Sequence, residues 1–278
     1  MLTTSQLKSV LQAHGLRLSK RLGQHHLIDA RVLGNLVQSC ELTPHDTVVE
    51  IGAGLGALTE LLAPRVARLI AVEIDRGVCA VLAERMKRFQ NVTVRCEDIL
   101  AFPWATAEGA VVVGAIPYHV TSPILVALCE QRAHLKAAWL LLQREVARRL
   151  LAPPGTKAYG RLSVLCQYGW KLAEVMKVPR QAFFPPPTVD SSWLRLIPAC
   201  APPAAGNNEP LLFEIVKAAF GQRRKKLVNG LTHAGLASQA QAETAVVRLG
   251  LPMTVRAEAL SLEQFVSLAE MLSLLQPL

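Results

Sequence analysis

Hydrophobic residues follow two patterns that alternate along much of the chain, one typical of β-strands and one typical of α-helices. Short runs of β-branched and apolar residues, followed by glycine, acidic or polar residues, predict strands. These runs cover residues 46–52, 67–75, 91–98 and 109–118. Apolar residues at helical spacing predict helices at residues 57–67, 76–89 and 122–132, and a strand that runs into a helix at residues 135–151. This alternation of strands and helices predicts a doubly wound parallel sheet.

The pattern changes in the second half of the chain. Residues 174–198 place a proline cluster between two strand-like stretches, which predicts a long connection between antiparallel strands at one edge of the sheet. Residues 199–210 are rich in Ala, Pro and Asn and predict a linker. The following segments, at 212–231, 237–250 and 261–272, are purely helical. We therefore expect an α/β domain over residues 1–200, with an N-terminal extension over residues 1–20, and a small helical domain over residues 208–278.

Composition and charge narrow the class of protein. Of the 278 residues, 51% are apolar and 18% are charged, which excludes a disordered chain. The net charge of +9 favours a polyanionic partner, nucleic acid rather than membrane. No apolar run reaches the ~18 residues that span a bilayer, and the N-terminus lacks a continuous apolar signal region, so we expect a cytoplasmic protein. The 6 cysteines form no CxxC pair, which predicts buried, reduced thiols and no metal site.

A glycine-rich segment follows the first predicted strand. Gly52, Gly54 and Gly56 occupy the junction of strand and helix, where a tight turn and a ligand lying against the backbone both require glycine. Glu73 ends the next strand about 20 residues later, where a carboxylate binds a ribose diol. Asp98 ends the third strand and offers an acceptor to an adenine amino group. Together these residues predict a site for an adenine nucleoside cofactor.

The identity of that cofactor depends on the spacing of the glycines. The spacing is G-x-G-x-G, whereas dinucleotide sites have G-x-G-x-x-G, and the acidic Glu50 precedes the first glycine. This form resembles the loop of class I S-adenosylmethionine-dependent methyltransferases, and a carboxylate at Glu50 suits the cationic methionine end of that cofactor. The resemblance favours S-adenosylmethionine over NAD. A loop that only closes a strand–helix turn is the remaining alternative.

The strand at residues 109–118 ends in the motif Ala115, Ile116, Pro117 and Tyr118. In amino-group methyltransferases this position carries an (Asn/Asp/Ser)-x-Pro-(Tyr/Phe) motif. An exocyclic amine is a poor nucleophile because its lone pair is delocalised into the ring, so acceptors that hold its N–H groups favour the attacking geometry. The final aromatic residue stacks on the base. The alternative is an ordinary strand end with a buried tyrosine.

Ordered segments from about residue 20 to residue 265 resemble one family. They are KRLGQHHLID, VVEIGAGLGALTELL, VEID, IPYHVTSPIL, LLQREVARRL, YGRLSVLCQY, FFPPPTVDS, FGQRRKKLVNGL and RAEALSLEQF. The chain is similar to the rRNA adenine N6,N6-dimethyltransferases of the KsgA type, which modify paired adenines near the 3′ end of small-subunit rRNA. The resemblance implies a Rossmann-like class I methyltransferase sheet with a small C-terminal all-helical domain, S-adenosylmethionine as methyl donor, and no metal.

The resemblance also implies roles for particular residues. Cofactor contacts fall on Gln24, His25, Leu27, Gly52, Gly54, Glu73, Ile74, Asp98, Ile99 and Ala115. The target adenine contacts Ala115, Ile116, Pro117, Tyr118 and Phe183. Tyr118 and Phe183 are expected to stack on its two faces. Packing of the proline-rich loop is the alternative role for Phe183.

Two positions depart from the family pattern. Ala115 stands where the family usually has Asn, which leaves the Ile116 carbonyl as the acceptor; losing one such contact typically costs on the order of 10²–10³ in rate. His26 replaces an apolar aromatic residue. Three functions remain open. The first is an rRNA (adenine-N6,N6-)-dimethyltransferase with a role in ribosome assembly. The second is an rRNA-binding assembly factor with weak or lost methylation, and the third is a methyltransferase of the same fold with another substrate.

Basic residues give the expected RNA contacts. They are Arg144, Arg148, Arg223, Arg224, Lys225 and Lys226, of which the last four are expected to begin a basic helix of the second domain. Such a cluster attracts phosphates, although a solvated helix face is the alternative. We expect small-subunit rRNA or a pre-ribosomal small subunit as the partner, bound by a monomer through RNA shape. The adenine would be turned out of its stack into the pocket.

Overall fold

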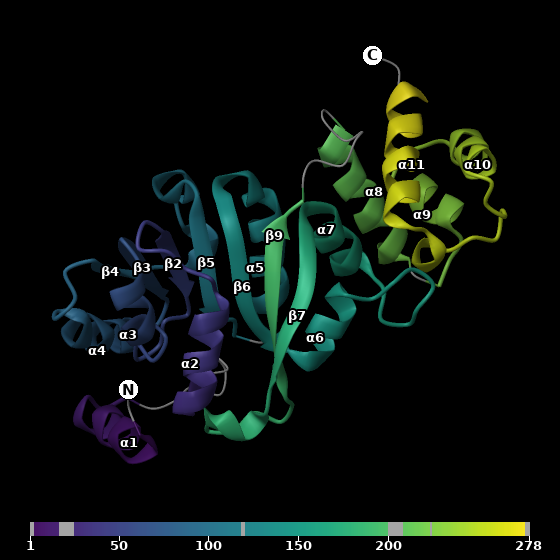
Figure 1. Ribbon diagram of the computed structural model, residues 1–278. Helices are drawn as coiled ribbons and strands as arrows, with labels where there is room; N and C mark the ends of the chain where they lie inside the picture. The colour runs from purple at the N-terminus through teal and green to yellow at the C-terminus, as the bar shows by residue number, and fades with distance from the viewer. Residues whose placement is uncertain (1–2, 17–24, 118–119, 200–207, 223, 276–278) are drawn as a thin grey trace. The chain divides into compact units, whose positions relative to one another are not determined.

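The computed structural model in Figure 1 describes most of the chain. The described residues are 3–16, 25–117, 120–199, 208–222 and 224–275. The chain forms two compact units. The first consists of Met1–Ala147 and Lys171–Pro198, and the second of Arg148–Trp170 and Ala199–Leu278.

A 7-stranded sheet with the order β4-β3-β2-β5-β6-β9-β7 forms within the described residues, and Figure 1 shows its strands side by side. Their bounds are β2 Thr47–Ile51, β3 Arg68–Glu73, β4 Val92–Cys96, β5 Ala110–Ala115, β6 Leu135–Gln143, β7 Trp170–Val178 and β9 Ser191–Pro198. Strand β2 pairs in parallel with β3 and β5, β3 with β4, and β5 with β6. The predicted parallel sheet is therefore confirmed.

The proline-rich stretch connects strands at one edge of this sheet, as the sequence predicts. Strand β9 is antiparallel to β6, and β7 is the edge strand on the other side of β9. Between β7 and β9 lie the 3₁₀ helix η6 Arg180–Ala182 and the short strand β8 Phe183–Phe184. The latter reaches the candidate site.

Helices precede, connect and follow the parallel strands. They are α1 Thr4–Ala13, α2 Ala30–Ser39, α3 Thr59–Leu62, α4 Arg76–Met86, α5 Thr121–Glu130 and α6 Arg144–Leu150, with 3₁₀ helices η1 Ala63–Arg65, η2 Ile99–Ala101, η3 Trp104–Ala107 and η5 Arg132–His134. The helix expected over residues 57–67 is one α-helical turn that continues as a 3₁₀ helix, because Pro64 has no N–H to extend the α-helical ladder. None of the helices in the described part of the chain has the length and apolar character needed to span a bilayer.

Helix α2 was not predicted from the sequence. It begins after Asp29, whose carboxylate accepts hydrogen bonds from the backbone N–H groups of Arg31 and Val32. Leu33 and Leu36 pack from this helix into an apolar cluster with strands β2, β5 and β6. Leu82 and Met86 of α4 pack in a separate apolar cluster. These contacts fix the strand ends and the loops that follow them, where the candidate site lies.

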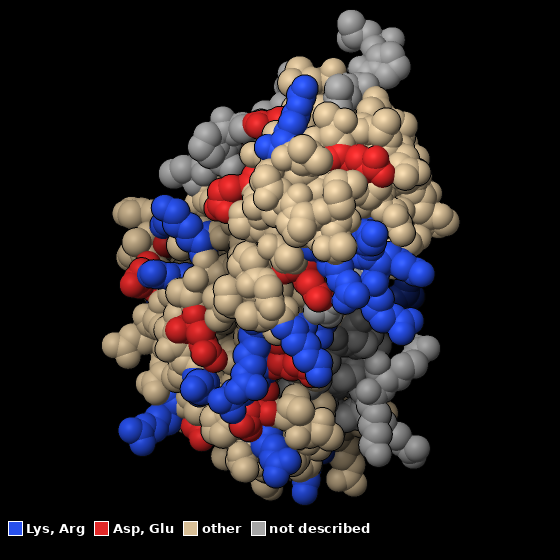
Figure 2. Space-filling model, turned by 90° about the vertical axis from the view of Figure 1, so that its right-hand side faces the viewer, with Lys and Arg blue, Asp and Glu red and all other residues tan. Residues whose placement is uncertain are grey.

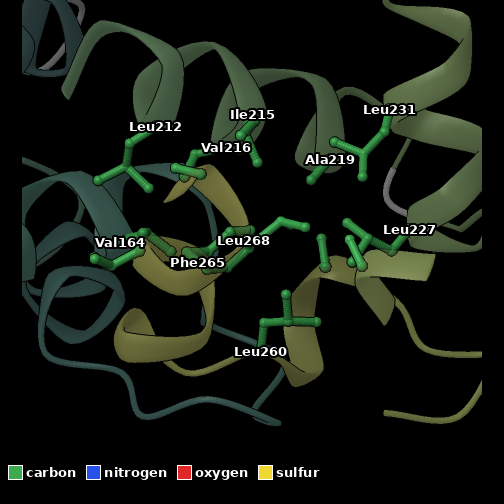
Figure 3. Packing of buried hydrophobic residues seen from close by; sticks show 14 of the residues in the cluster. Val164, Leu212, Ile215, Val216, Ala219, Leu227, Leu231, Leu260, Phe265 and Leu268 are labelled. Atoms are coloured by element: carbon green, nitrogen blue, oxygen red, sulfur yellow. The ribbon is translucent and has the colours of Figure 1, made fainter. Parts of the chain in front are cut away.

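The second unit is helical. Its elements are α7 Arg161–Gly169, α8 Glu209–Gly221, α9 Leu227–His233, α10 Gln239–Arg248, η8 Ala257–Ala259 and α11 Leu262–Leu275. In Figure 3 the side chains of Leu212 and Val216 from α8 point toward Phe265 and Leu268 from α11. The expected all-helical architecture of this part is therefore present.

The division of the chain differs from the expected boundary near residue 200. Residues 148–170, which the sequence places in the first domain, belong to the second unit. Tyr159, Val164 and Tyr168 are buried in its core, and the Tyr168 hydroxyl donates to Glu209 at 3.2 Å. A local hydrophobic pattern does not say which of two cores such a segment joins.

The basic run also differs from expectation, because it lies in a turn. Helix α8 ends at Gly221, and α9 begins at Leu227 with Lys226 as its N-cap residue. Arg224 and Lys225 lie in the connecting turn, and Arg223 falls outside the described residues. Positive side chains are unfavourable in the first turn of a helix, where the backbone carries partial positive charge. This gives a physical reason for the helix to begin after the run.

Candidate functional site

The candidate site lies at the carboxyl ends of strands β2, β3, β4 and β5. The chain runs outward from β2 through β3 to β4 and then returns to β5 on the other side of β2. Ligands of doubly wound sheets bind at such a reversal, in the crevice beyond the strand ends. A cavity lies there, with about 170 Å³ open to the centres of water molecules. One water needs roughly 10–15 Å³, so the cavity has room for an organic ligand.

Most of the predicted site residues line this cavity. They are His25, Gly52, Gly54, Glu73, Ile74, Asp98, Ile99, Ala115, Ile116, Pro117 and Phe183. The predicted residues Gln24 and Tyr118 lie outside the described part of the chain. Residues that follow four different strands therefore meet in one place.

Glu73 joins the end of β3 to the glycine-rich loop. Its Oε2 accepts a hydrogen bond from the N–H of Gly54 at 2.9 Å, and its Oε1 accepts from the N–H groups of Ile74 and Asp75, both at 3.0 Å. A carboxylate offers about four lone-pair sites. These three bonds therefore leave capacity for a further donor, such as a ribose hydroxyl.

Gly54 itself has φ +56°, a conformation that residues with a Cβ rarely adopt. A Cβ at this position would lie 3.4 Å from the ring of His26. The loop contacts His26 and the carboxylate of Glu73 at this point, and its backbone is exposed to the cavity because residue 54 has no side chain. An uncovered backbone is what a ligand lying against this loop requires.

Glu50, which precedes the loop, does not have the role that the sequence suggested. Its side chain is 1% exposed, and its Oε2 accepts a hydrogen bond from the Thr59 hydroxyl at 2.7 Å. Burial raises the pKa of Glu50 to about 8, with a smaller contribution from the negative charge of Glu73 and against the effect of the Thr59 hydrogen bond. Glu50 is therefore largely protonated near neutral pH. Glu50 does not line the cavity, whereas Glu73 does.

Asp98 and its neighbours form another wall of the cavity. The Oδ1 atom of Asp98 accepts a hydrogen bond from the N–H of Leu100 at 3.0 Å, which caps the 3₁₀ helix η2. Ile74 and Leu100 also line the cavity and are unusually exposed for large apolar residues, at 55% and 46%. Exposed apolar surface beside a hydrogen-bond acceptor suits a flat ring that carries an amino group, such as adenine.

A two-stranded sheet brings the N-terminal loop to the proline-rich loop. Strand β1, His26–Leu27, pairs antiparallel with β8, and Leu27 lies opposite Phe183. Phe183 is buried and lines the cavity. Leu27, for which the sequence predicts a cofactor contact, is 6% exposed and packs in the apolar core. It does not line this cavity; it lies beside Phe183 on the same face of the two-stranded sheet and packs into the same apolar cluster.

The two histidines at the start of β1 both line the cavity. The Nδ1 atom of His25 lies 2.7 Å from the carbonyl oxygen of Pro185, which ties the two loops together. Burial lowers the pKa of His26 to about 4, helped by the neighbouring charge of His25. His26 is therefore a neutral imidazole at neutral pH.

The end of β5 touches the glycine-rich loop. A Cβ on Gly52 would lie 3.4 Å from the carbonyl oxygen of Ala115 and 3.7 Å from Cδ of Pro117. The N–H of Ile116 donates to the carbonyl of Leu141 at 3.1 Å, which holds the residue beyond the strand end against β6. The motif at the end of β5 is thus fixed beside the loop for which a cofactor was predicted.

Comparisons with known proteins identify the family. Residues 15–274 match the model of the family described as ribosomal RNA adenine dimethylase. The chain belongs to this family. It is 38% identical to ribosomal RNA small subunit methyltransferase A from Geobacillus kaustophilus, over 98% of this chain and 96% of that protein. It is 39% identical to the protein of the same name from Pelotomaculum thermopropionicum, over 95% of this chain and 94% of that protein.

Solved structures of the family's fold agree. A dimethyladenosine transferase from Plasmodium falciparum is 25% identical with a TM-score of 0.74, covering 87% of this chain and 95% of that chain. The 23S rRNA methyltransferase ErmE is 27% identical with a TM-score of 0.67, covering 89% of this chain and 99% of that chain. The Rossmann-like class I methyltransferase fold expected from the sequence is confirmed.

Several cavity residues of this family member were not predicted from its sequence. They are Ile51, Val72, Val78, Glu97, Leu100, Val120, Ile124 and Leu141, together with His26. Glu97 and Leu100 adjoin predicted residues, so their position after the third strand was an available signal. Val120 and Ile124 are four residues apart at the start of α5, a spacing that equally fits a buried helix face.

Metal ligation finds no support in the described residues, where no three His, Cys, Asp or Glu side chains gather as a metal site. Four cysteines are buried, as predicted: Cys40, Cys79, Cys129 and Cys166. Cys96 is exposed, contrary to the prediction, because it ends strand β4. Cys200 falls outside the described part of the chain.

The basic residues predicted to contact RNA are distributed over both units. Arg144 is the half-buried first residue of α6, and Arg148 is exposed in the same helix. Arg224, Lys225 and Lys226 are exposed in the turn before α9. Figure 2 shows one face of the molecule, on which Lys and Arg side chains gather in several groups with Asp and Glu side chains between them. Exposed basic groups of this kind are suited to phosphates.

Proposed function

We propose that this chain transfers methyl groups from S-adenosylmethionine to N6 of adenines in small-subunit rRNA, forming dimethyladenosine, with a role in ribosome assembly. One observation carries the proposal. A single cavity joins Glu73 and Asp98, at the ends of β3 and β4, to the Ile116–Pro117 segment and Phe183. Membership of the ribosomal RNA adenine dimethylase family over residues 15–274 supports the same chemistry.

The residues at the strand ends fit S-adenosylmethionine. When bound, this cofactor supplies a reactive methyl group on a cationic sulfur. Glu73 retains a lone pair for the ribose hydroxyls, and the exposed carboxylate of Asp98 is an acceptor for the adenine amino group. Ile74 and Ile99 provide apolar surface for the ring. The uncovered backbone at Gly52 and Gly54 leaves space for the methionine part.

The end of β5 is the proposed place for the target adenine. Ala115 offers no side-chain acceptor, so the Ile116 carbonyl is proposed to hold an N–H of the adenine amine. The ring of Phe183, packed beside Leu27, is proposed to stack on the base. Because the glycine-rich loop touches Ala115 and Pro117, an amine held there lies next to the methyl donor. Such positioning supplies much of the rate enhancement in group transfer.

The proposed partner is small-subunit rRNA in a pre-ribosomal particle. The exposed basic side chains of Arg148, Arg224, Lys225 and Lys226 are proposed to contact phosphates, with Arg144 and Arg223. Recognition of RNA shape rather than base sequence suits contacts of this kind. We further propose that the protein acts as a monomer in the cytoplasm, where ribosomal subunits are assembled.

The test is transfer of labelled methyl groups from S-adenosylmethionine to small ribosomal subunits that lack adenine dimethylation. Large subunits from the same cells provide the matched comparison. The proposal predicts label in the small subunits, recovered after digestion as N6-methylated adenosine. Label that appears only in large subunits, or in a nucleoside other than adenosine, would contradict it.

A further inference from the structure

A second, much smaller cavity adjoins β1. Its walls are Leu7, His26, Leu27, Ile28, Leu55, Ala57 and Arg85. About 20 Å³ is open to the centres of water molecules. Since one water needs roughly 10–15 Å³, this volume accommodates a single water. His26 is a wall of both cavities.

Two complementary nitrogen atoms belong to the residues of this small cavity. Nε2 of His26 and Nε of Arg85 are both buried and have no hydrogen-bond partner among the described residues. The Nε–H of arginine is always a donor, and Nε2 of a neutral imidazole is an acceptor when the proton is on Nδ1. Buried polar groups without partners are costly, and a cavity that a water can bridge relieves both.

We propose that this cavity binds one water molecule, which accepts a hydrogen bond from the Nε–H of Arg85 and donates one to Nε2 of His26. The remaining walls of the cavity are aliphatic side chains, so these two nitrogens are the side-chain partners for the water. Two polar partners are enough to hold a buried water in place. The other end of the Arg85 side chain is fixed, because its Nη2 contacts Glu60 at 2.5 Å.

The bridging water determines which nitrogen of His26 carries the proton. With Nε2 accepting from the water, the proton resides on Nδ1. The Nδ1 and Cε1 atoms form the edge of the ring that lies against Gly54, each 3.4 Å from the position of a Cβ there. The lowered pKa of His26 agrees with a neutral ring. Arg85 thus acts through the water as a positioning residue, which presents His26 to the glycine-rich loop as an N–H donor.

This donor suits a carboxylate on a ligand that lies along the glycine-rich loop. The methionine part of S-adenosylmethionine carries such a carboxylate, and this last step rests on the proposed function. The water site itself does not depend on that function. An apolar aromatic residue at position 26 would neither hold the water nor offer the N–H group.

Nitrogen-15 NMR of the histidine rings tests the water site directly, with His26→Phe used to assign the His26 signals. In the native protein we expect Nε2 to give the signal of an unprotonated, hydrogen-bonded nitrogen and Nδ1 that of a protonated one. Arg85→Met removes the donor and keeps an apolar stem, and should shift the ring toward a mixture of both tautomers.

Arg88→Met is the matched control. Arg88 also pairs with Glu60, at 3.1 Å, but it is not a wall of the cavity. Its replacement should leave the His26 signals unchanged. A native ring protonated at Nε2, or an equal response to Arg85→Met and Arg88→Met, would overturn the proposal.

Calorimetry tests the link to the ligand. Loss of one oriented hydrogen bond predicts that Arg85→Met weakens S-adenosylmethionine binding about three- to tenfold, with no change in Arg88→Met. A changed tautomer with unchanged affinity would retain the water site and refute the contact with the carboxylate. If native protein binds no S-adenosylmethionine, the proposed function fails, and the NMR result still decides the water site.

Discussion

The carboxyl group of Glu50, in β2, accepts a hydrogen bond of 2.7 Å from the hydroxyl of Thr59, in α3. Both side chains are buried, at 1% and 0% exposed. The bond joins the strand before the glycine-rich loop to the helix after it. The loop that faces the cavity is therefore closed at its base by a buried polar pair, and the protonation of that pair affects stability.

Replacement of Glu50 by Gln should change how stability depends on pH. The pKa of Glu50 is about 8 in the folded chain, against 4.5 for an ordinary glutamate. Between these values the folded state holds more protons than the unfolded state, so the native protein loses stability as pH rises from about 4.5 to about 8. Gln stays neutral and can still accept from Thr59. Thermal unfolding should show Glu50→Gln more stable than native protein above pH 8, by on the order of 5 kcal/mol, and similar to it near pH 5.

Glu84→Gln controls for the loss of one negative charge, because Glu84 is exposed on α4. It should leave the pH profile of the native protein nearly intact. The same pH profile in Glu50→Gln and native protein would show that Glu50 is ionised in the fold.

Ala115→Asn should accelerate methyl transfer. Asn at this position adds an acceptor at the end of β5, where the native side chain has none, and one positioned polar contact is typically worth on the order of 10²–10³ in rate. Single-turnover transfer to unmethylated small subunits measures the change. Ala115→Leu, which adds volume without an acceptor, should bring no increase. A silent native protein with an active Ala115→Asn variant would favour an rRNA-binding assembly factor that has lost its catalytic acceptor.

The basic turn before α9 should contribute to the salt dependence of RNA binding. Replacing both Lys225 and Lys226 by Gln should weaken binding to small-subunit rRNA and make the slope of log affinity against log salt shallower by about one to two. Lys217→Gln is the control, since Lys217 lies on α8 and pairs with Glu214. Equal slopes for the double variant and the native protein would show that this turn does not contact phosphates.

Much of the site could be predicted from the sequence because its residues follow strands. Glu73 and Asp98 come directly after runs whose hydrophobic period marks them as strands, and the carboxyl ends of parallel strands meet at one edge of a sheet. The glycine spacing identifies the loop because Gly54 has a positive φ, a backbone conformation that favours glycine and is therefore visible in the sequence. Local patterns therefore determined this part of the cavity.

Contacts between segments that are far apart in the sequence could not be predicted, because no local pattern of residues marks them. Strand β1 has only two residues, too few to show a period, yet its pairing with β8 places His26 and Leu27 beside Phe184 and Phe183 at the candidate site. The assignment of residues 148–170 to the second unit likewise depends on which core Tyr159 and Tyr168 enter. The burial of Glu50 depends on tertiary packing, so its raised pKa was not evident from its place before the glycines.

The measurement that tests the proposed site most directly is calorimetric titration of S-adenosylmethionine into native protein, Glu73→Ala, Asp98→Ala and the control Arg88→Met. We expect native protein and Arg88→Met to bind alike, with affinity in the micromolar range typical of metabolite sites. Glu73→Ala should bind at least about tenfold more weakly, because it removes the ribose acceptor and leaves the N–H of Gly54 unpaired. Asp98→Ala, at an exposed position, should fold normally and bind several-fold more weakly. No detectable binding by native protein, or native affinity in both Glu73→Ala and Asp98→Ala, would contradict the assignment of this cavity to the methyl donor.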